Sequence, residues 1–380
     1  MKITQEQAQE RLIKSDEYVS CTEAFLDCRL PGSVPKGNYS LIGPGVTQSE
    51  NQVINLREKH GFNIGAASMP NGVTNNLHIH FSAEVFMCTY GEYTFRWGSN
   101  GEYEYTAHEG DILSVPTWLF RGFTNTGPDG SWLFTCLGED DTGGVIWHPD
   151  IMQAANESGM YLTKNNVLID LEAGGKLPDD QSELMPIFPS EEFDNLRNVD
   201  FETMASRIST RSNRKFYDNA LIDSVIPGHS SSISSVIGYG IMQNRNSQPP
   251  INNPHNFTME VMKVPAGNTV GPFLIDDKMV IIQTHGKIEL IFNQEQNVSV
   301  MVEKNDTYSV PAGIWRSITN NGDQDAEFIV IISGDHRKRP QFNDEILAQS
   351  RELGFTLDAS GYIVKSNLVI EESTLLAGKL

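Results

Sequence analysis

The sequence of 380 residues is poor in cysteine. Its four cysteines all lie in the first half of the chain, and no two of them have CxxC spacing: Cys21, Cys28, Cys88 and Cys136. A disulfide framework needs a denser set of cysteines, and a zinc ribbon needs CxxC pairs. We therefore expect four reduced thiols, with Cys88 and Cys136 in the core.

The sequence also lacks an excess of positive charge and any long hydrophobic run. Its formal net charge is -21 and its pI is near 4.8, so its field repels nucleic acid and anionic membrane surfaces. No run of about 18 apolar residues is present, which argues against a transmembrane helix. The polar start, MKITQEQAQERLIKS, predicts a short amphipathic helix and has no apolar signal core. We expect a cytoplasmic protein with no nucleic-acid or membrane partner.

What the sequence does contain is an internal duplication. IGPGVTQ at Ile42 matches IGYGIMQ at Ile237, and SVPTWLFRGFTN around Pro116 matches SVPAGIWRSITN around Pro311. Both pairs are 195 positions apart (237 − 42 and 311 − 116). Chance matches would not keep one offset over so long a stretch, so the chain is two copies of one module. The length of the chain also favours two domains.

Each copy consists of short predicted strands broken by Gly, Pro and Asn. Examples are EYTFRWG, DILSVP and SWLFTCLG in the first copy, and KIELIFN and AEFIVIISG in the second. This spacing predicts an all-β sandwich or barrel. Each copy ends in a predicted helix, PDIMQAANESG or NDEILAQSRELG. We expect barrels over residues 1–165 and 216–380, and an irregular connector rich in Pro, Gly and acidic residues over 166–215.

Two stretches of the first copy have the spacing of a known family. The stretch NNLHIHFSAEVFMCTYG carries His78, His80, Glu84 and Gly91. The stretch GDILSVPTWLFRGFTN carries Gly110, Pro116, Arg121 and Asn125. Together they resemble the two motifs of the cupin superfamily, except that Arg121 stands where a histidine is usual. The resemblance covers nearly all of both repeats, and the chain looks like a bicupin similar to metal-dependent cupin dioxygenases. It implies two tandem double-stranded β-helix (jelly-roll) barrels with a few peripheral helices.

The residue types in the first stretch predict a metal site. On a strand His78 and His80 point to one side. Glu84 points to that side as well if the strand continues, and a tight turn at FSAE would equally bring its carboxylate to the two histidines. Two imidazoles and one carboxylate leave positions open on an octahedral ion and suit Fe(II) oxygen chemistry. We expect one divalent ion per chain, with Fe(II) favoured and Mn, Ni, Co or Zn as alternatives. The other interpretation is a binding barrel whose histidines only hydrogen-bond a ligand.

Arg121 is predicted to be the catalytic residue that orients an anionic substrate. A guanidinium stays protonated and cannot ligate a metal, but its fork of donors suits a carboxylate or an enolate. A structural salt bridge is the alternative, because Arg316 occupies the same place in the second copy. At the ligand positions the second copy carries Phe273, Ile275 and Met279. We therefore expect the second barrel to bind no metal and to serve as a structural half.

Four aromatic residues in or beside the motifs are predicted to line the substrate pocket: Trp97, Trp118, Phe120 and Phe123. The whole pattern favours an Fe(II)-dependent dioxygenase that acts on a small organic acid or aromatic compound with O2, in a homo-oligomer. A metal-dependent lyase, isomerase or decarboxylase would use the same site without oxygen. A non-catalytic small-molecule-binding or storage bicupin is the alternative from another class.

Overall fold

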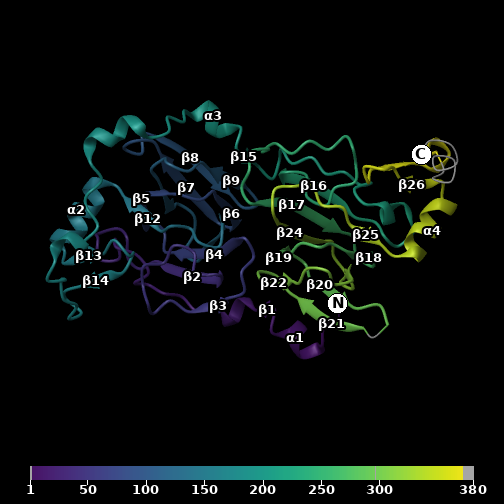
Figure 1. Cartoon of the computed structure of the whole chain (residues 1–380), viewed down its shortest axis with the longest axis horizontal. Coiled ribbons are helices and arrows are strands. Elements are labelled where there is room, and N and C mark those ends of the chain that lie inside the picture. Colours follow the sequence, from purple (N-terminus) through teal and green to yellow (C-terminus); the bar gives the residue numbers. More distant parts are fainter. Residues whose placement is uncertain (1, 296, 371–380) are drawn as a thin grey trace, which may run out of the picture. The chain divides into compact units, whose positions relative to one another are not determined.

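The computed structural model describes residues 2–295 and 297–370 (Figure 1). The chain divides into two compact units. The first barrel runs from Tyr18 to Arg214, and the second barrel comprises the chain up to Glu17 together with the chain from Lys215 onward. These boundaries differ from the expected ones in two respects: the N-terminal stretch belongs to the second barrel, and the predicted connector belongs to the first.

The first barrel is built from two facing sheets. Its five-stranded sheet has the order β12-β5-β10-β7-β8, and its seven-stranded sheet has the order β15-β9-β6-β11-β4-β2-β3. The strands are β2 (Gly37–Ile42), β3 (Ile54–Leu56), β4 (Phe62–Met69), β5 (Thr74–His80), β6 (Glu84–Tyr90), β7 (Glu92–Trp97), β8 (Tyr103–His108), β9 (Ile112–Val115), β10 (Arg121–Asn125), β11 (Ser131–Gly138), β12 (Val145–Trp147) and β15 (Ile208–Ser209). Every pairing within these two sheets is antiparallel except that of β2 with β3.

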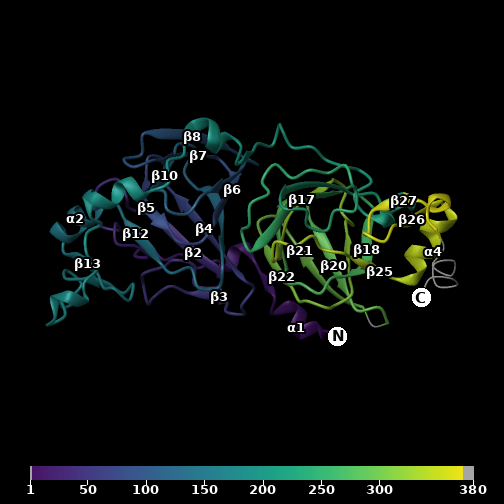
Figure 2. The same cartoon turned by 45° about the horizontal axis from the view of Figure 1, so that its top comes forward.

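The second barrel repeats this plan. Its sheets have the orders β1-β22-β19-β24-β17-β16 and β21-β20-β23-β18-β25 (Figure 2). The strands are β1 (Leu12–Ile13), β16 (Ser232–Ile237), β17 (Phe257–Val264), β18 (Thr269–Leu274), β19 (Met279–His285), β20 (Ile288–Phe292), β21 (Val298–Val302), β22 (Thr307–Val310), β23 (Arg316–Thr319), β24 (Ala326–Ser333) and β25 (Gln341–Phe342).

The predicted helices are present at the ends of both copies. They are α2 (Pro149–Glu157) and α4 (Asp344–Glu352), and each is followed by a small two-stranded sheet, β13 (Met160–Leu162) with β14 (Leu168–Asp170) or β26 (Phe355–Leu357) with β27 (Ile363–Lys365). The predicted N-terminal helix is short, because α1 (Gln5–Gln9) gives way to β1. The connector contains α3 (Phe201–Ala205), short 3-10 helices and β15, and β15 pairs with β9, which explains why the connector belongs to the first barrel.

The equivalence of the two copies extends to single turns. Gly91 ends β6 with φ +80°, and its counterpart Gly286 has φ +69°. A side chain at Gly91 would also meet Ser131, whose Oγ would lie 2.0 Å from the added Cβ. Only glycine fits this left-handed turn at such a close approach. The expected all-β bicupin architecture from an internal duplication is therefore confirmed.

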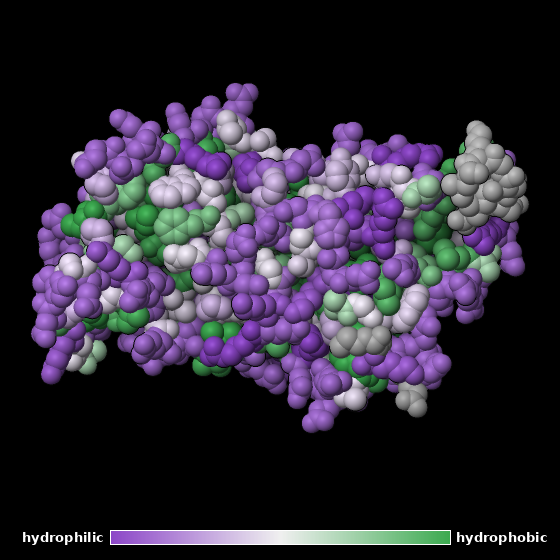
Figure 3. Space-filling model, in the orientation of Figure 1, coloured by the Kyte–Doolittle hydropathy of each residue, from purple (hydrophilic) through white to green (hydrophobic). Residues whose placement is uncertain are grey.

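Three features of the structure bear on the expectations from composition, namely the cysteines, the surface and the helices. All four cysteines are free thiols, and Cys88 and Cys136 are buried as expected. Hydrophilic side chains cover most of the face drawn in Figure 3. Among the described residues, no helix combines the length and the apolar character needed to cross a membrane.

Candidate metal centre

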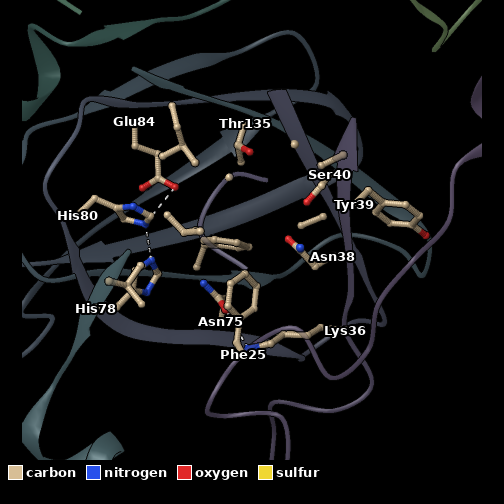
Figure 4. Close-up of a pocket in the computed structure, with 18 of the residues that line it drawn as sticks. Phe25, Lys36, Asn38, Tyr39, Ser40, Asn75, His78, His80, Glu84 and Thr135 are labelled. Atoms are coloured by element: carbon tan, nitrogen blue, oxygen red, sulfur yellow. Dashed lines mark hydrogen bonds and ion pairs between the residues drawn. The ribbon is translucent and has the colours of Figure 1, made fainter. Parts of the chain in front are cut away.

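Two of the predicted ligands lie on β5, between β12 and β10 in the five-stranded sheet. His78 pairs with Arg121 on β10 and with Trp147 on β12, and His80 pairs with Val145 on β12. Because the two histidines are two residues apart on one strand, both rings point into the barrel (Figure 4). Their Nε2 atoms face each other at 2.9 Å, and both side chains are buried.

The third predicted ligand comes from the opposite sheet. The chain turns between His80 at the end of β5 and Glu84 at the start of β6. The tight turn, and not a continuation of the strand, therefore places the carboxylate beside the histidines. Glu84 Oε1 lies 3.5 Å from His80 Nε2. One ligand atom from each of the three side chains lies within 4.8 Å of the others, and all three residues are buried. The predicted triad is therefore brought together inside the first barrel.

The protonation of the histidines suits metal binding. His78 Nδ1 lies 2.6 Å from the carbonyl of Asn76, so Nδ1–H donates to it and Nε2 keeps a lone pair. Burial, together with the positive charge of Arg121, lowers the pKa of His78 to about 3 and that of His80 well below its usual value. Both rings are thus neutral at pH 7. Two neutral imidazoles with converging nitrogens are the form in which histidine binds a metal.

Glu84 and its neighbours leave several buried polar atoms without a hydrogen bond. Burial raises the pKa of Glu84 to about 7, and Arg121 opposes this shift only in part. Nε of Arg121 is 3.3 Å from Oε2 of Glu84, an ion pair without hydrogen-bond geometry. No hydrogen-bond partner is present among the described residues for His80 Nδ1, Glu84 Oε2, Arg121 Nε or Arg121 Nη1, although Oε2 and Nε form this ion pair with each other. Buried polar atoms are normally satisfied, and Oε2 of Glu84 is the atom of this set that a cation could satisfy, whereas Nη1 is unsatisfied in the equivalent Arg316 of the second barrel as well. A divalent ion fits the donor set of two imidazoles and a carboxylate.

Arg121 occupies a position that both barrels use in the same way. Its Nη2 donates to the carbonyl of Pro116 at 3.1 Å, and Nη2 of Arg316 donates to the carbonyl of Pro311 at 3.2 Å. Arg316 donates in addition to Ile314 and Ile275. The arginine is therefore part of the shared scaffold, and in the first barrel it gains one feature, its pairing with Glu84.

A cavity opens beside the three candidate ligands. Its volume is about 60 Å³, measured as space open to the centre of a water molecule, which is room for about four waters or one small organic molecule. The charged residues that line it are Glu84 and Lys36. The polar side chains around the rest of the wall include Asn38, Ser40, Asn75 and Thr135, and Figure 4 shows them around the same space. The ring of Tyr39 points away from this space and packs on Trp132.

One of the four predicted pocket aromatics lines this cavity, namely Phe123. Trp97 is buried elsewhere, where its Nε1 donates to the carbonyl of Val199 at 2.9 Å. Phe120 packs against Phe188 at 5.7 Å between ring centroids. Trp118 is 43% exposed. Within the described part of the chain, these three aromatics do not line the cavity. Trp97 and Phe120 pack against the connector instead.

Sequence reasoning missed several other residues that line the cavity. Lys36 immediately precedes β2, while Asn75 lies on β5 three residues before His78. Trp147 also lines the cavity and contacts His78, with ring centroids 5.4 Å apart. The one available signal was position in the repeat: Lys36 corresponds to Ser231 in the second copy (231 − 36 = 195), so the lysine, like the histidines, occurs in the first copy alone.

Comparison with known proteins supports the fold. No family model and no curated protein matches the sequence. The oxalate decarboxylase of Bacillus subtilis is similar with a TM-score of 0.52 and 13% identity over 89% of this chain and 79% of that one. The formate complex of Lactobacillus farciminis oxalate decarboxylase gives a TM-score of 0.52 and 11% identity over 87% and 90%. Vicilin from Corylus avellana (hazelnut) gives a TM-score of 0.50 and 9% identity over 87% of each chain. Identities this low concern the fold alone, and the fold is that of a bicupin, as the two motifs predicted.

Proposed function

We propose that the protein is a mononuclear non-haem metal enzyme, and specifically an Fe(II)-dependent dioxygenase that acts on a small organic acid or aromatic compound. The observation that carries the proposal is the buried meeting of His78, His80 and Glu84 beside a cavity, in a setting where neighbouring polar atoms lack partners. Buried polar groups that converge without satisfying one another are costly in a purely structural role.

The residues have distinct tasks in this proposal. His78 and His80 present neutral nitrogens, and Glu84 presents a carboxylate from the facing sheet. Arg121 holds the carboxylate in place and offsets its charge within a buried site. An ion held by these three side chains would have open positions for a substrate and for dioxygen side by side, which suits Fe(II) oxygen chemistry. The walls of the cavity exclude bulk water and orient the substrate.

A reaction without oxygen is the second candidate. The similar Bacillus subtilis oxalate decarboxylase has Mn(II) centres. A lyase, isomerase or decarboxylase on this chain would use the same three ligands with Mn, Ni, Co or Zn. The likeness of fold alone does not favour either reaction, so oxygen uptake is the property that separates them.

Metal analysis of protein purified without oxygen tests the proposal. We expect about one divalent ion per chain in the parent, and loss of the ion in the double variant His78→Ala/His80→Ala. The matched control is the second-barrel variant Phe273→Ala/Ile275→Ala, which should keep the ion. Retention of the ion by the histidine variant, or two ions per chain, would contradict the proposed centre. Substrate-dependent oxygen consumption by the iron-loaded parent then distinguishes the dioxygenase from its oxygen-free alternative.

A further inference from the structure

A buried ion pair lies at the wall of the same cavity. The ammonium of Lys36 contacts Oδ1 of Asp27, and the two side chains are 5% and 0% exposed. Lys36 Nζ also donates to Oδ1 of Asn75 at 2.8 Å. A lysine is rarely buried unless it is paired, because burial of an uncompensated charge is costly. Desolvation accordingly lowers the pKa of Lys36. The question is why the first barrel keeps a charge pair at this place.

The aspartate alone is explained by the scaffold. Oδ2 of Asp27 accepts the backbone N–H of Asn76 at 3.2 Å, and Oδ2 of Asp223 accepts the backbone N–H of Gly271 at 2.6 Å in the second barrel. Asn76 and Gly271 are equivalent (271 − 76 = 195). Both barrels therefore use a buried aspartate to fix the same strand, and this use needs no lysine.

The lysine is specific to the first barrel. In the second barrel the nearest basic group to Asp223 is His229, at 3.7 Å, and it comes from a different place in the repeat. Lys36 lines the cavity, and its ammonium lies 5.4 Å from the ring centroid of Phe25, which lines the cavity as well. Of its three N–H groups two have hydrogen-bond acceptors among the described residues. The Nδ2 amide group of Asn75 has no partner within that part of the chain either, and the side chain faces the cavity in Figure 4. One ammonium N–H and the amide group thus have no hydrogen-bond acceptor among the described residues and can donate to a ligand in the cavity.

We propose that Lys36 and Asn75 form the anion-binding subsite of this cavity and that its ligand is a small carboxylate. The inference rests on the proposed metal centre, because the other end of the carboxylate ligand would reach His78, His80 and Glu84. With a divalent ion in place, the two negative charges of Glu84 and Asp27 balance the two positive charges of Arg121 and Lys36. The two positive charges of the ion then remain uncompensated in a buried site; a monocarboxylate offsets one of them and a dicarboxylate offsets both.

The chemistry of the subsite favours a carboxylate over other anions. One ammonium N–H and one amide N–H match the two oxygens of a carboxylate. Phosphate and sulfate carry more oxygens and are commonly bound by arginine forks, and no arginine lines this cavity among the described residues. The volume of about 60 Å³ limits the ligand to a small molecule.

Calorimetric titration of the metal-loaded full chain tests the subsite. The probes are pyruvate, malonate and benzoate, with malonamide and benzamide as uncharged analogues. We expect at least one carboxylate to bind, its amide analogue to bind at least tenfold more weakly, and the variant Lys36→Met to lose at least tenfold in affinity for the carboxylate. Because Lys36→Met leaves Asp27 buried without its partner, the double variant Lys36→Met/Asp27→Asn provides a second test in which both charges are removed.

Two controls separate the subsite from general effects on folding. Lys338→Met removes a buried lysine of the second barrel, whose Nζ lies 3.7 Å from Asp277, and should leave carboxylate affinity unchanged. Metal content should be the same in every variant. Equal carboxylate affinity in the parent and in the Lys36 variants, or no binding of any of the three carboxylates by the parent, overturns the subsite. A parent that lacks metal but binds carboxylate through Lys36 overturns the proposed function and leaves the subsite standing.

Discussion

The two barrels share one backbone plan and differ in what fills it. On β4 the first barrel has Gly65 and Ala67, and both line the cavity. The equivalent positions on β17 carry Glu260 and Met262, which are buried (260 − 65 and 262 − 67 both equal 195). Larger side chains therefore occupy in the second barrel the volume that is open in the first. The cavity arises from small residues on one strand rather than from a different fold.

The ligand positions show the same contrast. His78, His80 and Glu84 converge with polar atoms unsatisfied, whereas Phe273, Ile275 and Met279 belong to the apolar core of the second barrel. The second barrel shows that this architecture folds with a filled, largely apolar interior. The polar, hollow interior of the first barrel is thus a cost in stability that the fold does not require, which is the pattern expected of a functional site.

The largest expected effect comes from hollowing the second barrel. Met262→Ala removes a fully buried side chain from the apolar core, and we expect the second barrel to lose about 2–5 kcal/mol of stability. The reverse change in the first barrel, Ala67→Met, fills existing space and should change stability by less than about 1.5 kcal/mol. Hydrogen exchange of amides in β17 and β4 measures each barrel separately. Equal losses in the two variants would contradict the contrast between a filled and a hollow interior.

Removal of metal should act on one barrel only. If the ion binds the folded first barrel alone, saturation at about 100 times Kd stabilises that barrel by roughly 2.7 kcal/mol, and chelation reverses the gain. We expect faster exchange of amides in β5 and β6 after chelation, with no change in β18 and β19. The variant His78→Ala/His80→Ala should show no response to the chelator. A response of equal size in both barrels would place the ion, or the effect of the chelator, outside the predicted centre.

The candidate ligands could be predicted from sequence because they are close together in the chain. The spacing of His78, His80 and Glu84 fixes their meeting through one strand and one turn, and Gly91 marks the turn that follows. Lys36 was not predicted, because it lies 39 residues from its partner Asn75 and only the pairing of distant strands brings them together. Spacing within a motif contains no information on such contacts.

The pocket aromatics and the boundaries were misjudged for a related reason. Trp97 and Phe120 look like pocket residues because they flank the motifs, but the connector folds onto the barrel and covers them with Val199 and Phe188. The N-terminal stretch was assigned to the first barrel because it precedes it. Its strand β1 pairs instead with β22, so the order of the chain and the order in space differ.

A pH effect on stability is expected in the second barrel from one buried glutamate that has no counterpart at the same position of the first barrel. Burial raises the pKa of Glu260 to about 8, and its Oε2 accepts the N–H of Ile241 at 2.9 Å. The folded state therefore holds this proton more tightly than the unfolded state, whose glutamate has its usual pKa of 4.5. The contribution to stability is full below pH 4.5 and is lost as the pH rises toward 8, with a slope of up to about 1.4 kcal/mol per pH unit.

The variant Glu260→Gln checks this effect. Glutamine keeps an oxygen acceptor for Ile241 and cannot titrate, so the stability of the second barrel should fall less steeply between pH 5 and 8 in the variant. Exchange of β17 amides, corrected for the intrinsic effect of pH, measures the slope. Gly65 holds the equivalent position in the first barrel and provides no such group. An unchanged slope in the variant would assign the pH dependence to other residues.

The smallest expected effect concerns the two equivalent arginines. Arg316 donates to the carbonyls of Pro311, Ile314 and Ile275, and one lysine ammonium on a thinner stem cannot reproduce that fork. Arg316→Lys should therefore cost the second barrel roughly 1–3 kcal/mol. Arg121 makes one such bond, to Pro116, in addition to its ion pair with Glu84. Arg121→Lys keeps the charge beside Glu84 and should cost the first barrel about 1 kcal/mol, with metal content unchanged.

Carboxylate affinity in these two variants decides between Arg121 and Lys36. If Lys36 anchors the anion, Arg121→Lys and Arg316→Lys both bind pyruvate, malonate or benzoate within about twofold of the parent, because neither arginine lines the cavity among the described residues. A loss of tenfold or more in Arg121→Lys alone would instead assign the anchor to Arg121, as a charge-assisted bidentate contact is lost there. The unpaired Nη1 of Arg121 would then be its donor to the substrate. Because the two arginines share their scaffold role, a difference in carboxylate affinity between Arg121→Lys and Arg316→Lys arises from the ligand site.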